Sequence, residues 1–261
     1  MLGVLTNPQE AKASLLSSHG FAVLNVEYFG FPDYEWHIRM EKFESALRYL
    51  QRHRSVDSTS GIAIVGLCKG AQIGLCMAGC MSGIRGVVAI NGPPMPAHNS
   101  HQYGEKVWPL PETSETSELE STQSLSAGLR YTFPIHYDDD TGLADCPVFP
   151  FYNRHDVSVM YVAGLNDNNV PAEHFANCTE KLLSSAQHPD YIVERYPGAG
   201  HLLQPPYTPF CVRYKLSTYD QMLDYGGMKI PHCRAQIDCW EKTIAFLRRV
   251  TNSSNTFRGK L

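Results

Sequence analysis

The sequence has no long hydrophobic run and no excess of basic charge. No apolar stretch approaches the ~20 residues that a helix needs to span a bilayer, so we expect a soluble protein. Lysine and arginine number 22 against 26 aspartates and glutamates, which gives a formal net charge of -4. Nucleic-acid-binding domains usually carry a clear basic excess, so this balance argues against a nucleic-acid partner. Hydrophobic residues at 43% and charged residues at 18% are typical of a globular protein.

A secretion signal is also missing, since the N-terminus has no cationic start followed by an apolar run and a small-residue cleavage site. We therefore expect an intracellular, reducing compartment in which the eight cysteines stay free. Their spacing does not match a metal site. Cys76 and Cys80 fall within a helical pattern, and Cys233 and Cys239 have no second pair to complete a ligand set. Most of these cysteines are expected to be small buried hydrophobic residues.

Helical and strand-like segments alternate along most of the chain. Short apolar runs predict strands at 21–28, 62–65, 86–90, 159–164 and 191–196. Helical patterns fall at 8–19, 33–53, 68–81, 171–185 and 235–250. This alternation predicts an α/β fold with a mostly parallel sheet and helices on both faces. At this length we interpret 1–261 as one domain.

Residues 93–156 interrupt the alternation. They hold many prolines and a polar run at 113–118, so we expect an irregular insertion or lid rather than a second domain. The three aspartates at 138–140 lack the glycine and carboxylate spacing of a calcium loop, so we expect a solvated loop there.

The segment Gly66-Leu67-Cys68-Lys69-Gly70 lies between a predicted buried strand and a predicted helix. It matches the nucleophile elbow of α/β-hydrolases, with sulfur in place of oxygen. The glycines are needed because side chains beside so tight a turn would collide with neighbouring strands. The start of the helix would point N–H groups and its positive dipole end at the sulfur, which favours thiolate. We predict Cys68 as the nucleophile and the backbone N–H of Lys69 as an oxyanion-hole donor; a buried structural cysteine is the alternative.

A thiolate nucleophile needs a base, and in this fold an acid and then a histidine follow the nucleophile on later loops. Asp167 follows the predicted strand 159–164, and His201 follows the predicted strand 191–196. Each alone has a structural explanation, because loop aspartates often cap helices and a histidine after a glycine turn is often structural. Their order behind the elbow predicts a triad of Cys68, His201 and Asp167. We expect His232 to be structural or to support the site.

With these residues in view, the chain resembles the catalytic domain of the type I acyl-CoA thioesterases and bile acid-CoA:amino acid N-acyltransferases. The resemblance runs from about Ala11 to Arg249. Its most specific pieces are Gly66 to Ala78, Ile90 to Gly92, Tyr196 to His201, Gln204 to Pro209, Gly226-Gly227, Pro231-His232 and Ala235-Gln236. The resemblance implies an α/β-hydrolase fold, Cys68, Asp167 and His201 as nucleophile, acid and base, and a fatty or bile acyl-CoA as substrate. We expect no bound metal and no cofactor, with the coenzyme A thioester as the substrate.

Members of that family carry an N-terminal β-sandwich domain, then a strand and a glycine-rich loop that lends one oxyanion-hole N–H. This chain begins Met1-Leu2-Gly3, so we expect the sandwich and most of that loop to be absent.

Two reactions remain open. We name first the hydrolysis of fatty acyl-CoA to free acid and coenzyme A, because it needs no acceptor pocket. The alternative is acyl transfer to glycine or taurine, which the resemblance associates with cysteine at position 68, and a thioester intermediate is reactive toward amines. A dienelactone-hydrolase-like enzyme and an inactive truncated homologue are further alternatives. The ending Gly259-Lys260-Leu261 is similar to a peroxisomal address except at the glycine, so cytosol and peroxisome both stay open.

Overall fold

The computed structural model describes residues 2–6, 10–28, 37–57, 59, 61–97, 99–110, 147–216 and 221–251. Six parallel strands form its central sheet, in the order β2-β1-β4-β5-β8-β9. They are β1 (Leu2–Thr6), β2 (Phe21–Asn25), β4 (Ile62–Leu67), β5 (Ile84–Ile90), β8 (Ser158–Gly164) and β9 (Tyr191–Tyr196). Every residue of β4 is buried, as a parallel strand covered on both faces should be. The predicted parallel sheet is confirmed.

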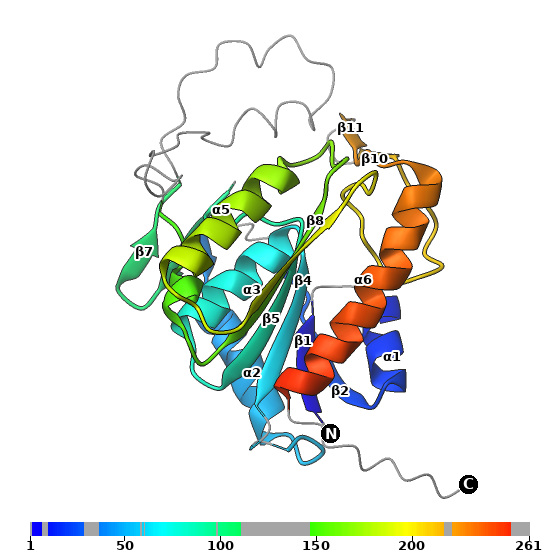
Figure 1. The fold of residues 1–261 in the computed structure, drawn as a ribbon. Helices are drawn as coiled ribbons and strands as arrows, with labels where there is room; N and C mark the ends of the chain where they lie inside the picture. The colour runs from blue at the N-terminus through cyan, green and yellow to red at the C-terminus, as the bar shows by residue number, and fades with distance from the viewer. Residues whose placement is uncertain are drawn as a thin grey trace, which may run out of the picture.

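Helices cover both faces of this sheet (Figure 1). They are α1 (Glu10–Ser18), α2 (Glu41–Arg52), α3 (Lys69–Cys80), α5 (Ala172–Ser185) and α6 (Lys229–Val250). In Figure 1, α2, α3 and α5 lie on one face, while α1 and α6 lie on the other. The core follows the period of two along β4, since Ile62 and Ile64 pack on the first face and Ala63 and Val65 on the second. The predicted α/β fold, with helices on both faces of a mostly parallel sheet, is therefore confirmed.

The segment around the predicted insertion is more regular than the sequence suggests. The strand β3 (His37–Arg39) pairs with β6 (Ser100–Tyr103), and β6 pairs with β7 (Lys106–Trp108). The prediction of a helix from residue 33 is therefore wrong at its start, because pairing with a distant strand overrides the local helical pattern. The prediction of an irregular segment is likewise wrong over β6 and β7. A short 3-10 helix, η2 (Pro150–Asn153), lies near the end of the predicted insertion. Residues 111–146, with the polar run and the three aspartates, lie outside the described residues.

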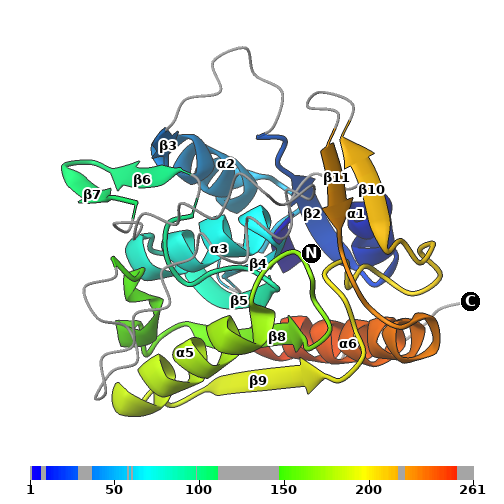
Figure 2. The same ribbon diagram turned by 90° about the horizontal axis from the view of Figure 1, so that it is seen from above.

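Three further elements lie where the sequence predicts none. The strand β1 lies between β2 and β4. The strands β10 (Arg213–Leu216) and β11 (Gln221–Asp224) form a hairpin near the N-terminal end of α6 (Figure 2). Helix α6 begins at Lys229, earlier than the predicted residue 235, because a proline at 231 fits the first turn of a helix, where no N–H partner is lost.

No helix in the described ranges combines the length and the apolarity that crossing a membrane requires. The C-terminal tripeptide lies outside those ranges. The peroxisomal address and the single domain over 1–261 stay predictions.

Candidate active site

Cys68 occupies a strained turn between β4 and α3. Its backbone has φ 54° and ψ -117°, which side-chain-bearing residues rarely adopt. The turn is held on both sides, because the Cys68 N–H donates to the carbonyl of Ile90 at 2.8 Å and its own carbonyl accepts from the Gln72 N–H at 3.1 Å. A Cβ added at Gly66 would lie 2.2 Å from the carbonyl oxygen of Gly70. The glycine is thus required by space, as the elbow pattern predicts.

His201 and Asp167 meet at the same edge of the sheet. The Nδ1 atom of His201 lies 2.7 Å from Oδ2 of Asp167, and their side chains are 2% and 1% exposed. The other carboxylate oxygen of Asp167 accepts the backbone N–H groups of Asn169 at 2.7 Å and Val170 at 3.0 Å. Both carboxylate oxygens therefore act as acceptors, so Nδ1 of His201 carries a proton and Nε2 is left for Cys68.

The charges of Cys68 and His201 stabilise each other. Burial raises the pKa of the Cys68 thiol, and the negative charge of Asp167 acts in the same direction. The charge and hydrogen bond of His201 lower this pKa, as does the backbone N–H of Lys69, and together they hold it below its usual value. Burial lowers the pKa of His201, but the charges of Asp167 and Cys68 and the hydrogen bonds to both raise it to about 10. Both shifts favour the charged forms, the thiolate of Cys68 and the imidazolium of His201, over the neutral ones.

Three residues that the sequence did not single out as catalytic hold the His201 loop. The Tyr225 ring stacks on the imidazole with centroids 5.7 Å apart, and the Tyr225 carbonyl accepts the His201 N–H at 2.7 Å. The side-chain amide of Asn91 donates to the His201 carbonyl at 2.7 Å. His232 accepts the Gly200 N–H at Nδ1 and lies 3.0 Å from the carbonyl of Leu202 through Nε2, so it supports the loop as a neutral ring.

Asn91 belongs to a motif that carries the family resemblance, which is the one sequence signal that could have marked it. Tyr225 has no such signal.

The side chain of Lys69 anchors the start of α3. Its Nζ donates to the carbonyl of Ala97 at 2.7 Å. The side chain of Gln72, also in the first turn of α3, donates to the carbonyl of Met95 at 2.6 Å. Burial lowers the pKa of Lys69 to about 7, against the opposing charge of Cys68. These two contacts fasten the first turn of α3 to the segment that follows β5.

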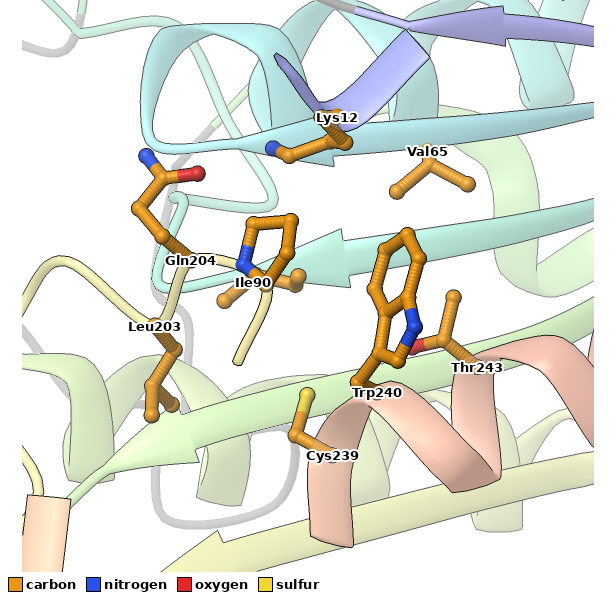
Figure 3. Close-up of a pocket in the computed structure, with 9 residues that line it drawn as sticks. Lys12, Val65, Ile90, Leu203, Gln204, Cys239, Trp240 and Thr243 are labelled. Carbon is orange, nitrogen blue, oxygen red and sulfur yellow. The ribbon is translucent and has the colours of Figure 1, made fainter. Parts of the chain in front are cut away.

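A small pocket lies between the sheet, α1 and α6, and the segment that follows His201 borders it (Figure 3). It is lined by Lys12, Val65, Ile90, Leu203, Gln204, Pro205, Cys239, Trp240 and Thr243. Burial raises the pKa of the Cys239 thiol to about 12, although Thr243 and Lys12 act in the opposite direction. The Oε1 atom of Gln204 is buried without a hydrogen-bond partner. None of the predicted triad residues lines this pocket. Across the described residues, no group of three or more His, Cys, Asp or Glu side chains could hold a metal ion.

Comparison with known proteins gives consistent relatives. Residues 38–253 match the family described as "BAAT / Acyl-CoA thioester hydrolase C terminal". The bile acid-CoA:amino acid N-acyltransferase of Mus musculus is 33% identical over 92% of this chain and 56% of its own length. Acyl-coenzyme A thioesterase 1 of Mus musculus is 30% identical over 97% of this chain and 59% of its own length. The chain thus spans somewhat more than half the length of these relatives.

Solved structures support the fold. A dienelactone hydrolase-like promiscuous phosphotriesterase from metagenomic libraries superposes with a TM-score of 0.57 and 15% identity, covering 96% of this chain and 87% of that one. At this identity the likeness concerns the α/β-hydrolase fold alone. The family match covers most of the chain, including every residue of the predicted triad. The chain therefore belongs to the family of the bile acid-CoA:amino acid N-acyltransferases and acyl-CoA thioester hydrolases.

Proposed function

We propose that this chain hydrolyses fatty acyl-CoA thioesters, with Cys68 as the nucleophile, His201 as the acid and base, and Asp167 as the residue that orients His201. The observation that carries the proposal is the 2.7 Å hydrogen bond between His201 and Asp167, beside a thiol whose pKa is lowered by His201. The substrate class comes from the thioesterases and acyltransferases to which the chain is related.

The first half-reaction is acylation of Cys68. The thiolate attacks the carbonyl carbon of the thioester, and the resulting oxyanion accepts a hydrogen bond from the backbone N–H of Lys69. The tetrahedral intermediate then collapses, the bond from carbon to the coenzyme A sulfur breaks, and the His201 imidazolium gives its Nε2 proton to that sulfur. An acyl-Cys68 thioester and a neutral His201 remain.

The second half-reaction releases the acid. Acylation removes the Cys68 charge, which is one of the causes that raise the pKa of His201. The pKa of His201 therefore falls, and the neutral imidazole left by acylation can take a proton from water as the water oxygen attacks the acyl carbon. Collapse of this intermediate expels the Cys68 thiolate beside a protonated His201, which restores the starting pair.

Acyl transfer to an amine is the second candidate, and the sulfur of Cys68 favours it. A thioester reacts more readily with amines than an oxygen ester does, so glycine or taurine could replace water in the second half-reaction. One of the relatives is named as an amino acid N-acyltransferase.

The test is incubation of the chain with palmitoyl-CoA, with and without glycine or taurine, and quantification of coenzyme A, palmitate and amide. Mass spectrometry should find a palmitoyl adduct on the Cys68 peptide. We expect Cys68→Ala to abolish both adduct and turnover. Cys80→Ala, which removes a half-buried thiol at the other end of α3, is the matched control and should preserve both. Turnover by a folded Cys68→Ala variant, or no adduct and no turnover with the native chain, would overturn the proposal.

A further inference from the structure

One buried side chain, Asn91, joins the two loops that carry Asp167 and His201. Asn91 follows β5 directly and is 0% exposed. Its Oδ1 accepts the backbone N–H of Gly164 at 2.8 Å, at the start of the Asp167 loop. Its Nδ2 donates to the carbonyl of His201 at 2.7 Å and to that of Gly200 at 3.3 Å. The amide and the three backbone groups that it contacts are all buried. A buried polar group without a hydrogen-bond partner is costly.

The two loops touch at the point that Asn91 joins. A Cβ added at Gly164 would lie 2.5 Å from the carbonyl oxygen of Gly200, so the two backbones are in direct contact there. Gly200 precedes His201 in the chain, and Gly164 lies three residues before Asp167. A shift of either loop at this contact therefore moves His201 relative to Asp167.

The chemistry at position 91 suits asparagine. The site needs an acceptor toward Gly164 and a donor toward the His201 carbonyl on one planar group, which a side-chain amide provides. The backbone of Asn91 has φ 47°, a left-handed conformation that asparagine tolerates better than most residues. Its N–H donates to the carbonyl of Val162 at 2.9 Å, which fixes the residue to β8.

We propose that Asn91 is a positioning residue, whose side-chain amide sets the separation of the Asp167 and His201 loops and so keeps His201 within hydrogen-bonding reach of both Asp167 and Cys68. This inference rests on the proposed function, since it assigns a purpose to the amide within that triad. Asn91 does not contact the reacting atoms; it acts through the backbone of the base and of the acid loop.

Asn91→Asp is the sharpest test, because it keeps the size of the side chain and the acceptor toward Gly164. It replaces the donor group by a carboxylate oxygen, which would face the carbonyl oxygens of Gly200 and His201. It also adds a negative charge, which Asn91→Gly does not. Misplacement of a catalytic group by about 1 Å can cost about 10²-fold. We expect kcat with palmitoyl-CoA to fall by about 10–10²-fold, while KM changes little.

A second readout does not depend on turnover. The rate at which iodoacetamide alkylates Cys68, followed by mass spectrometry of its peptide across pH, reports the thiolate fraction. We expect the apparent pKa of Cys68 in Asn91→Asp to rise toward the ordinary thiol range, because His201 no longer holds its proton beside the sulfur. Asn91→Gly, which suits the left-handed backbone but lacks the amide, should show the same rise.

The control is Leu183→Ala near the C-terminal end of α5, which destabilises the core at a fully buried position outside the loops that carry Asn91, Asp167 and His201. It should leave the Cys68 profile and kcat unchanged at temperatures where the protein stays folded. The inference is overturned if Asn91→Asp and Asn91→Gly titrate like the native protein, or if Leu183→Ala shifts the profile as they do. Retained turnover in Cys68→Ala would instead remove the proposed function, so the two failures are distinguishable.

Discussion

Replacement of Asp167 by asparagine should separate the geometry of the proposed triad from its charge. The amide oxygen can still accept the N–H groups of Asn169 and Val170, so the loop keeps its hydrogen bonds. The amide nitrogen would then face Nδ1 of His201 across the present 2.7 Å contact. Since that nitrogen is a donor, Nδ1 must become an acceptor and the ring proton must move to Nε2, which faces Cys68. Nε2 would then have no lone pair with which to take a proton from Cys68.

The size of the effect follows from the burial of the pair. Both side chains are almost fully buried, so water screens their interaction little. An opposite charge at hydrogen-bonding distance changes a pKa by about 1–3, which corresponds to about 1.4–4 kcal/mol. The pKa of His201 should fall by about that much, and the pKa of Cys68 should rise because its cationic partner is lost. General acid–base catalysis contributes about 10²–10⁴-fold, so turnover should fall within that range.

Two measurements check this result. The first is turnover of palmitoyl-CoA, followed by loss of its thioester absorbance, and the second is the pH dependence of Cys68 alkylation. Asp156→Asn is the control, because Asp156 lies at the surface with its side chain 52% exposed and pairs with Arg154. A loss of turnover below tenfold in a folded Asp167→Asn protein, with an unchanged alkylation profile, would refute the role of Asp167.

Two further substitutions probe the sulfur atoms. Cys68→Ser keeps the elbow and His201 but forms an oxygen ester, so if the native protein makes amides, the ratio of amide to free acid should fall; equal loss of both products would show that sulfur does not select the acceptor. Cys76→Ala removes a 0% exposed sulfur from α3 and should lower the free energy of unfolding by about 0.5–1.5 kcal/mol, as small cavity-forming changes do. Turnover should stay close to the native value, because Cys76 is not part of the proposed triad. Loss of turnover without unfolding in Cys76→Ala would contradict Cys68 as the nucleophile.

The elements that the sequence predicts well are those whose signal is local. The parallel strands and the helices between them follow from short apolar runs and helical periods, and the turn at Cys68 follows from glycines placed two residues to either side. Asp167 and His201 come together because parallel strands end at one edge of the sheet, so their order along the chain already constrains their place.

What the sequence does not predict depends on contacts between distant segments. The strand β3 lies in a helical pattern and forms only because β6, more than sixty residues later, pairs with it. The motif Ile90 to Gly92 includes Asn91 in the family resemblance, but only the bonds of Asn91 to Gly164 and His201 show what its side chain does. Tyr225 follows a hairpin with no local signal, yet its ring stacks on the base. Such contacts leave no period or spacing in a single sequence.

Two thiols in this fold show why the arrangement around Cys68 matters more than burial or a nearby cation. Burial raises the pKa of both Cys68 and Cys239. Lys12 acts to lower the pKa of Cys239, yet that pKa is still raised to about 12, so a neighbouring ammonium does not offset burial there. The pKa of Cys68 is lowered because His201 provides both a charge and a hydrogen bond. Asp167 contacts the ring of His201, and Asn91 contacts its backbone. We therefore expect thiolate formation at Cys68 to depend on the loops after β5, β8 and β9, and we expect a change in any one of these loops to alter the pKa of Cys68.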